Sequence, residues 1–205
     1  MTYQPNPTDA PPVLALMGSP RRGGNTDLLL GEFMDAVEEH GVGTEMVAVA
    51  ELNISPCRER YTCLDTGICG LKDDMAPLYD RLIQAQVVVV ATPIFFYGPT
   101  AQIKAVMDRC QALWCRKYHL KRPLDRTPGQ GYLISVAATN GRRLFDGLLL
   151  SARYFFNVLD LKLDGQLLVR GADLAGAVLD QPEALAQARA LGRDAAAFVR
   201  AGQGL

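Results

Sequence analysis

The segment from Val87 to Ala91 reads VVVVA and contains no polar residue. A strand with one face in water alternates polar and apolar residues, whereas a strand covered on both faces carries a continuous apolar run. Strands of the second kind occur in parallel sheets whose two faces are covered by helices. Residues 87–93 are therefore predicted to form a central strand of a parallel sheet.

Strand-like segments alternate with helical segments along the rest of the chain. The strand patterns lie at residues 13–19, 44–52, 87–93, 129–138 and 164–171. The helical patterns lie at residues 25–40, 75–85, 100–118, 143–161 and 182–201. This alternation has no internal repeat or linker, and it predicts a doubly wound α/β sandwich. We expect residues 13–205 to form a single domain and the proline-rich residues 1–12 to form a flexible tail.

Composition excludes several classes of partner. The chain has 205 residues, a formal net charge of -1 and 21% charged residues, so no basic excess would draw it to nucleic acid or to an anionic membrane. No apolar run approaches the roughly 18 residues of a membrane span, and the N-terminal residues lack the pattern of a signal peptide. A cytoplasmic location is expected, and the odd number of cysteines, five, favours reduced thiols over disulfides.

Three loops are predicted to meet at one edge of the sheet. Right-handed crossovers place the carboxyl ends of parallel strands on the same side, and ligands of such sheets bind there. The loops after the first, third and fourth strands read GSPRRGGNT (18–26), TPIFFYGPT (92–100) and AATNGRR (137–143). Any ligand is therefore expected at this edge.

The first loop has the composition of an anion cradle at the N-terminus of a helix. Its candidate phosphate ligands are the side chains of Ser19, Arg21, Arg22, Asn25 and Thr26, together with the backbone of Gly24. A triphosphate loop would need Lys where Gly24 stands, and no G-x-G-x-x-G dinucleotide motif follows the strand. A terminal phosphomonoester remains. The alternative is a solvated glycine-rich turn with surface arginines.

The other two loops suit a planar ring. Phe95, Phe96 and Tyr97 are consecutive, so they cannot all face the core, and at least one is expected at the sheet edge as a stacking face. The alternative is that these aromatics cap the core or a subunit interface. Gly98 allows close backbone approach, and Thr139, Asn140 and Gly141 add polar groups and flexibility. A ligand with a phosphate at one end and a planar polar ring at the other fits this combination, and FMN is such a ligand.

Three cysteines, Cys57, Cys63 and Cys69, follow one another at steps of six residues. Six residues turn a helix by about 240° or extend a strand by about 20 Å, so neither element gathers the three thiols. Only an irregular loop could do so, and Pro56 and Gly67 are among the breakers that such a loop needs. Structural zinc and cubane iron–sulfur sites normally take four ligands, and this loop offers three cysteines.

Several other reactive side chains have simpler interpretations. Cys110 and Cys115 lie in a helical pattern and are expected to be core or interface thiols. Lys104, Asp108 and Arg109 are expected to form i,i+4 pairs on a helix face. The two histidines form no obvious catalytic pair.

The three motifs together resemble the NADPH-dependent FMN reductases of the flavodoxin-like fold, and within them the iron–sulfur flavoprotein branch. The segments GSPRRGGNT, ATPIFFYGPTAQIKAVMDR and CLDTGICGLKDDM carry the resemblance, which extends from about residue 13 to the last helix. It implies a three-layer sandwich around a five-stranded parallel sheet of order 2-1-3-4-5. It also implies these cofactor contacts: Ser19, Arg21, Asn25 and Thr26 to the FMN phosphate, with Arg22 and Gly24 beside them; Pro93, Ile94, Phe95, Phe96 and Gly98 to the isoalloxazine, with Tyr97 beside them; and Thr139, Asn140 and Gly141 to the ring and ribityl chain.

The activity that the resemblance implies is hydride transfer from NAD(P)H to FMN, followed by electron transfer to a flavin, a quinone or another small molecule. The flavin supplies this chemistry, so no catalytic acid or base is expected among the side chains. One alternative is an electron carrier that exchanges electrons with ferredoxin-type partners, and another is a flavin-free binding protein. Family members usually dimerise across the flavin edge, so a homodimer or homotetramer is expected, with Trp114 and Tyr118 as candidate interface residues.

The iron–sulfur branch carries the motif C-x2-C-x2-C-x5-C, and this chain departs from it at one position. Cys57, Cys63 and Cys69 match the first, third and fourth cysteines, and Arg60 occupies the second position. Arginine has no acceptor atom, so a four-cysteine cluster cannot form from this loop without another donor. We therefore expect a cluster-free reductase without a metal site, with these three cysteines as the candidate ligands should a cluster bind.

Overall fold

The structure is a computed structural model that describes residues 11–204. Most of the expected tail, residues 1–10, lies outside the described residues. Pro12 lies inside them, and its carbonyl oxygen accepts a hydrogen bond from the backbone N–H of Val87 at 3.0 Å. The described chain therefore begins where the backbone joins the sheet.

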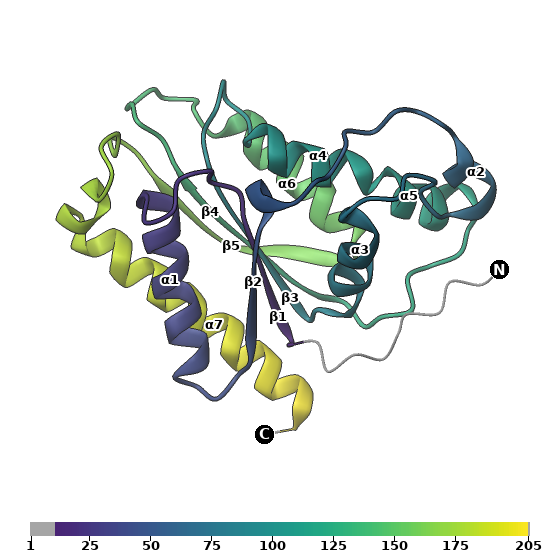
Figure 1. The fold of residues 1–205 in the computed structure, drawn as a ribbon. Helices are drawn as coiled ribbons and strands as arrows, with labels where there is room; N and C mark the ends of the chain where they lie inside the picture. The colour runs from purple at the N-terminus through teal and green to yellow at the C-terminus, as the bar shows by residue number, and fades with distance from the viewer. Residues whose placement is uncertain (1–10, 205) are drawn as a thin grey trace.

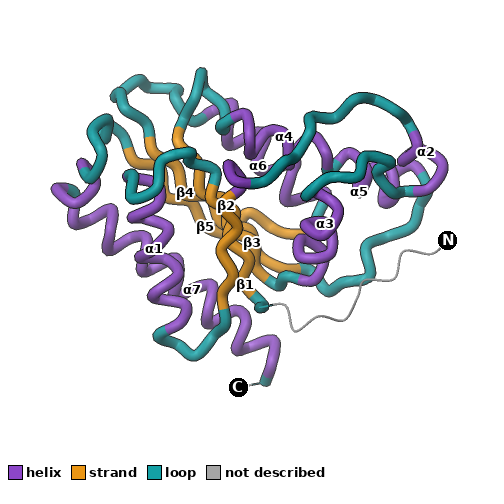
Figure 2. The backbone as a smooth tube through the Cα atoms, viewed as in Figure 1, coloured by secondary structure: helices purple, strands orange, loops and turns teal. Residues whose placement is uncertain are grey.

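Five parallel strands form the central sheet (Figures 1 and 2). They are β1 (Val13–Met17), β2 (Thr44–Ala48), β3 (Val87–Pro93), β4 (Gly129–Val136) and β5 (Leu161–Val169). Their order is β2-β1-β3-β4-β5, and every neighbouring pair is parallel. The flavodoxin-like sheet expected from the sequence is confirmed.

Helices cover both faces of the sheet. The longer helices are α1 (Asn25–Glu38), α3 (Met75–Gln84), α4 (Ala101–Arg109), α6 (Asp146–Val158) and α7 (Pro182–Gln203). Figure 1 shows α1 and α7 side by side on one face, with α3, α4 and α6 on the other. The α1–α7 contact is close, because a Cβ atom added to Gly192 would lie 2.2 Å from the carbonyl oxygen of Phe33.

The apolar run that begins β3 is buried on both sides. Val88 and Val90 belong to the core cluster beneath α3, α4 and α6, whereas Val87 and Val89 belong to the cluster beneath α1 and α7. Alternate side chains of a strand point to opposite faces, so a strand between two helical layers needs apolar residues at every position. The prediction of a central strand at residues 87–93 is confirmed.

Several strand boundaries differ from the sequence prediction. β1, β4 and β5 each end two residues earlier than predicted, at Met17, Val136 and Val169. β2 ends at Ala48 rather than at residue 52, because its neighbour β1 ends at the paired residue Met17. The chain then forms a 3-10 turn, η1 (Val49–Glu51). β5 begins at Leu161 rather than at residue 164, since Leu161 pairs with Gly129 at the start of β4. The preceding helix, α6, is correspondingly shorter than the predicted 143–161.

The helix predicted at residues 100–118 is interrupted at Cys110 and changes type in its second half. α4 ends at Arg109 and is followed by a short helix, α5 (Gln111–Trp114), and by a π-helical turn, η2 (Cys115–His119). The N–H of Leu120 donates to the carbonyl oxygen of Cys115 at 2.9 Å, the five-residue spacing that defines such a turn. Cys110 and Cys115 are buried thiols, as expected for core positions.

The loops that follow β1, β3, β4 and β5 come together at one edge of the sheet (Figure 1).

Within residues 11–204, no helix has the combination of length and hydropathy that a membrane span requires. The loop between η1 and α3 extends away from that edge and contains the short helix α2 (Thr62–Thr66).

Candidate functional site

A pocket of about 160 Å³ lies at the carboxyl edge of the sheet. Four loops form its walls. Its lining residues are Ser19, Pro20, Arg21, Gly24, Asn25 and Thr26 after β1, Pro93, Ile94 and Phe95 at the end of β3, Val136 and Ala138 at the end of β4, and Ala172, Asp173 and Ala175 after β5. The structure thus brings together most of the candidates from the first loop and the first part of the second.

The wall after β1 ends in the N-terminus of helix α1. Gly24 is the N-cap and has no side chain that could bond the first N–H groups, while the carboxylate of Asp27 in the first turn accepts a hydrogen bond from the N–H of Gly23 at 2.7 Å. The first N–H groups of a helix have no partner within it, so they can bind an anion. The hydroxyl of Ser19 accepts a hydrogen bond from the N–H of Arg21 at 3.1 Å, which fixes the turn, and Thr26 is buried at the pocket wall.

Asn25 has a structural role that the sequence did not reveal. Its side-chain amide donates to the carbonyl oxygens of Ala172 at 3.0 Å and Leu174 at 2.8 Å. Its side-chain oxygen accepts from the N–H of Val178 at 3.3 Å. The Asn25 side chain therefore joins the loop after β1 to the segment that follows β5, and its hydrogen-bonding groups are used in doing so.

The charged groups near this pocket differ in their availability. Arg21 lines the pocket, whereas Arg22 forms an ion pair with Glu51. That ion pair raises the pKa of Arg22, through the hydrogen bond and the charge of Glu51. Asp173 places one carboxylate on the opposite wall. Arg21 is therefore the cation best placed to meet an anion in the pocket.

The aromatic residues after β3 form a tight turn. Phe95 and Gly98 exchange two backbone hydrogen bonds of 3.0 Å, and the two residues between them have left-handed backbone angles, φ 48° at Phe96 and 64° at Tyr97. Bulky residues rarely adopt this conformation, and it costs about 1–3 kcal/mol. The Phe96 side chain is fully exposed, and Phe95 and Tyr97 are each more than half exposed. Of these residues, Phe95 lines the pocket.

The loop after β4 contributes less than expected. Thr139, Asn140 and Gly141 are exposed, and the pocket wall is formed instead by Ala138 just before them. The carbonyl oxygen of Thr139 accepts from the N–H of Gly171 at 3.3 Å, so this loop is attached to the end of β5. The structure places these three residues beside the pocket rather than in its wall.

Three buried hydroxyls below the pocket were missed from the sequence. Thr100 donates from its hydroxyl to the carbonyl oxygen of Gly18 at 2.8 Å, and its N–H donates to the hydroxyl of Thr92 at 3.2 Å. Ser135 donates to the carbonyl oxygen of Thr92 at 2.7 Å. These bonds connect the ends of β1, β3 and β4. A polar residue at the end of an otherwise apolar strand, such as Thr92, is the signal that could have identified them.

Gly18 lets the loop after β1 approach helix α4. A Cβ atom at this position would lie 2.2 Å from Cγ1 of Ile103 and 3.1 Å from the carbonyl oxygen of Ala91. No side chain fits in that space. The absence of a side chain at Gly18 therefore sets the height of the loop above the sheet.

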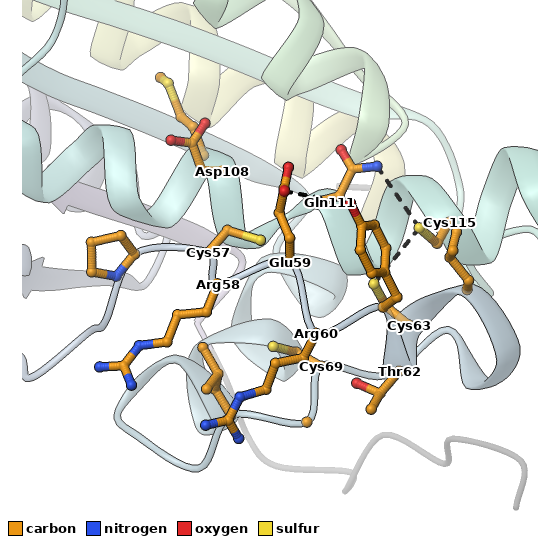
Figure 3. Close-up of a pocket in the computed structure, with 16 residues that line it drawn as sticks. Cys57, Arg58, Glu59, Arg60, Thr62, Cys63, Cys69, Asp108, Gln111 and Cys115 are labelled. Carbon is orange, nitrogen blue, oxygen red and sulfur yellow. Dashed lines mark hydrogen bonds between the residues drawn. The ribbon is translucent and has the colours of Figure 1, made fainter.

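A second, larger cavity of about 740 Å³ lies beside the cysteine loop (Figure 3). Cys57, Cys63 and Cys69 line it, and so does Cys115 from η2. The Sγ atoms of Cys63 and Cys115 lie 3.8 Å apart. Burial, together with the neighbouring Cys115 thiol, raises the pKa of Cys63 to about 11. Within residues 11–204, no three His, Cys, Asp or Glu side chains are grouped tightly enough to hold a single metal ion.

The two ends of the cysteine loop are fastened by one buried ion pair. Arg109 is entirely buried and donates to both carboxylate oxygens of Asp73, at 2.6 and 3.1 Å, and to the carbonyl oxygen of Ser55 at 2.9 Å. Asp73 also accepts from the N–H of Ser55 at 3.0 Å. The expectation that Arg109 pairs on the surface of its own helix was wrong. Lys104 and Asp108 do form the expected i,i+4 pair.

Comparison with known proteins identifies the family. Residues 11–161 match the family described as NADPH-dependent FMN reductase. The chain is 44% identical over 110 residues to an iron–sulfur flavoprotein of Archaeoglobus fulgidus, an alignment that covers 54% of this chain and 56% of the relative. It is 26% identical over 183 residues to the putative NAD(P)H-dependent FMN-containing oxidoreductase YwqN of Bacillus subtilis. That alignment covers 87% of this chain and 95% of the relative.

The solved structures agree in fold. The NAD(P)H:quinone oxidoreductase from Methanothermobacter marburgensis superposes with a TM-score of 0.66 at 17% identity, over 89% of this chain and 97% of that one. The chain spans about half the length of the iron–sulfur flavoproteins that it matches. The family match, however, covers most of the chain. This protein belongs to the family of NADPH-dependent FMN reductases.

Proposed function

We propose that the protein transfers a hydride from NAD(P)H to FMN held at the carboxyl edge of the sheet, and then electrons to a flavin, a quinone or another small molecule. Bound FMN would supply the redox chemistry, and the protein would bind and orient it. The observation that carries the proposal is the N-terminus of α1, whose N-cap Gly24 has no side chain and lines the same pocket as Arg21.

The phosphate of FMN suits the wall formed by the loop after β1. The N–H groups at the start of α1 favour an anion, and the hydroxyls of Ser19 and Thr26 and the guanidinium of Arg21 add hydrogen bonds. Asn25 would act through its backbone, because its side chain is already bonded to the segment after β5. Arg22 would act through its charge only, since it is paired with Glu51.

The ring of FMN suits the open side of the same pocket. The volume of about 160 Å³ is smaller than the roughly 300–1,000 Å³ of a complete small-molecule site, so the pocket fits the phosphate end and leaves the ring at its rim. Pro93, Ile94 and Phe95 are the apolar residues at that rim. Phe96, Tyr97, Gly98, Thr139, Asn140 and Gly141 lie in the loops around it and complete the proposed ring-binding set.

The proposal extends to the setting in which the protein acts. We place it in the cytoplasm as a homodimer or homotetramer, with Trp114 and Tyr118 as interface candidates. Their rings contact each other, with centroids 5.7 Å apart, and Trp114 is partly exposed. A second function is electron exchange with ferredoxin-type partners. One observation favours it, namely that several cysteines line the cavity beside α4.

Rapid mixing under anaerobic conditions separates the two functions. FMN-loaded protein is mixed with NADPH or NADH, and flavin absorbance is followed. A reductase loses the oxidised-flavin bands at a rate that rises with nicotinamide concentration. An electron carrier keeps those bands with both nicotinamides and loses them when a reduced ferredoxin is added.

Mutation tests the phosphate wall. Replacing Thr26 by Ala removes one hydrogen bond to a charged group, worth about 1.5–3 kcal/mol, and should weaken FMN binding roughly tenfold or more. Thr44→Ala is the matched control, because Thr44 begins β2 at the opposite edge of the sheet. Equal FMN affinity in the two variants would count against the assignment of the phosphate.

A further inference from the structure

Two thiols from distant segments meet at the wall of the larger cavity. The Sγ atoms of Cys63 in α2 and Cys115 in η2 lie 3.8 Å apart, and Figure 3 draws this contact. Both cysteines are free thiols in the structure. A disulfide has an S–S distance of about 2.05 Å, so the two sulfur atoms need to approach by about 1.8 Å to form one.

The backbones that carry the two thiols are also close. Gly67 ends the helical turn that begins at Cys63, because its N–H donates to the carbonyl oxygen of Cys63 at 3.0 Å. A Cβ atom added to Gly67 would lie 3.0 Å from Cβ of Arg116 and 3.4 Å from its Cα, and Arg116 directly follows Cys115. Bridged cysteines have Cα atoms about 4.4–6.8 Å apart. The approach of α2 to η2 at this point is close enough for a disulfide.

The two thiols differ in their access to solvent. Cys63 is partly exposed and Cys115 is buried, and both line the cavity of about 740 Å³. The amide of Gln111 donates to the sulfur of Cys115 at 3.8 Å, so this sulfur is held beside Cys63. An oxidant that enters the cavity meets Cys63 first and finds Cys115 next to it as a second thiol. Oxidation-sensitive cysteines are often paired with such a neighbour.

Helix α2 has the freedom to close the remaining gap. It is five residues long, and the backbone is left-handed at both of its ends, with φ 59° at Tyr61 and 73° at Gly67. The residues before it, 57–62, are exposed. Segments with few buried contacts move at a low cost in free energy. η2 is more firmly held, since Lys117 pairs with Asp160.

We propose that Cys63 and Cys115 are a modification site at which hydrogen peroxide produces a reversible disulfide. The Cys63 thiolate attacks the O–O bond, which gives a sulfenic acid on Cys63 and releases hydroxide. The Cys115 sulfur then attacks the sulfenic sulfur, the S–S bond forms, and the hydroxyl group leaves as water with the Cys115 proton. Two thiols lose two electrons and two protons, and one peroxide is reduced to two waters. A dithiol reductant reverses the reaction by thiol–disulfide exchange.

The disulfide would tie α2 to η2 across 52 residues of chain. A cross-link over a loop of this length removes many conformations of the unfolded chain. The oxidised protein should therefore unfold at a higher temperature than the reduced protein, by about 5–10 °C. The cysteine loop would lose its freedom to move relative to α5 and η2.

Peptide mapping of the full chain tests this inference. Reduced protein is freed of reductant and treated with hydrogen peroxide in mildly alkaline buffer, because burial raises the pKa of Cys63 and the thiolate is the reactive form. Remaining thiols are alkylated, and the unreduced digest is examined by mass spectrometry. The peptides of Cys63 and Cys115 should be joined, and dithiothreitol should separate them.

Variants separate this pair from general oxidation. Cys63→Ser and Cys115→Ala should each lose both the cross-link and the rise in melting temperature. Cys57→Ser is the matched control, because Cys57 is exposed and lines the same cavity, and it should keep both. Cys63→Ser carries the test by itself if the buried substitution at Cys115 prevents folding.

Several outcomes would overturn the inference. Peroxide-treated wild type in which Cys63 becomes a sulfinic acid while Cys115 stays a thiol shows that the pair does not close. A cross-link from Cys63 to Cys57 or Cys69, or between two chains, shows that Cys115 is not its partner. A cross-link that lowers the melting temperature shows that the native fold must be distorted to form it. FMN content measured on the same samples reports the proposed flavin site independently.

Discussion

Replacing Asp73 by Asn should break the buried ion pair that joins the two ends of the cysteine loop, and it should lower the free energy of unfolding by several kcal/mol. Asn keeps the shape of the side chain but removes the negative charge, and its NH2 group cannot accept a hydrogen bond from Arg109. The side chain of Arg109 is 0% exposed and that of Asp73 is 8% exposed, so neither water nor another carboxylate replaces the lost partner. An uncompensated buried charge costs about 3–5 kcal/mol, a large fraction of a typical stability of about 5–15 kcal/mol.

Urea unfolding followed by circular dichroism measures this change. Asp74→Asn is the matched control, because Asp74 also accepts a backbone bond, from Asn53 at 2.7 Å, but lies exposed and pairs with no arginine within residues 11–204. The control should lose about 1 kcal/mol. A loss below 1 kcal/mol for Asp73→Asn would refute the buried ion pair as the anchor of the loop.

The pH dependence of the same pair has a defined sign. Burial opposes ionisation of Asp73, but the hydrogen bonds from Arg109, Ser55 and Met75 outweigh it and lower the pKa of Asp73 below its ordinary value. A carboxyl whose pKa is lower in the folded state stabilises the fold above its unfolded pKa of about 3.9. The stability difference between wild type and Asp73→Asn should therefore be full at neutral pH and shrink as the pH falls below about 4. A difference that stays constant down to pH 3, roughly one unit under that unfolded value, would contradict the assignment.

Three further substitutions test individual features of the site. Phe96→Asn should raise stability by about 0.5–1 kcal/mol, because Asn tolerates the left-handed backbone of the aromatic turn, and a thermal melt that shows a loss would mean that the exposed ring has a packing role. Asn25→Ala should cost about 1–3 kcal/mol by removing three hydrogen bonds, two of them buried, measured by urea unfolding, and a neutral result would show that the link to the segment after β5 is dispensable. Gly18→Ala should cost about 1–3 kcal/mol in the same assay because its Cβ would meet Ile103 at 2.2 Å, and wild-type stability would show that α4 can move away.

The sequence predicts the sheet well because its signals are local. The apolar run at Val87–Ala91 identifies the central strand without any knowledge of its neighbours, and the glycine-rich turn after β1 identifies a helix N-terminus. The same local signals place the glycine-rich loop at the carboxyl edge of the sheet, where the structure has it. Boundaries were less accurate, since the ends of β2 and β5 depend on where their partner strands begin and end.

Long-range pairs could not be predicted in this way. Cys63 and Cys115 are 52 residues apart, and Asp73 and Arg109 are 36 residues apart, so no periodicity connects them. The sequence showed three cysteines in one loop, and the fold brings Cys115 beside them from another segment. Asn25 was correctly located in the first loop, but its hydrogen bonds to the segment after β5 appear only once the strands are assembled.

Calorimetric titration of the flavin-free protein with FMN and with riboflavin tests the central claim most directly, because the two ligands share the ring and differ in the phosphate. Two or more hydrogen bonds to the phosphate at the start of α1, each worth about 1.5 kcal/mol or more, predict that FMN binds at least about 100-fold more tightly. Equal affinities for FMN and riboflavin would contradict the assignment of the pocket at Ser19, Arg21 and Thr26 as the phosphate site.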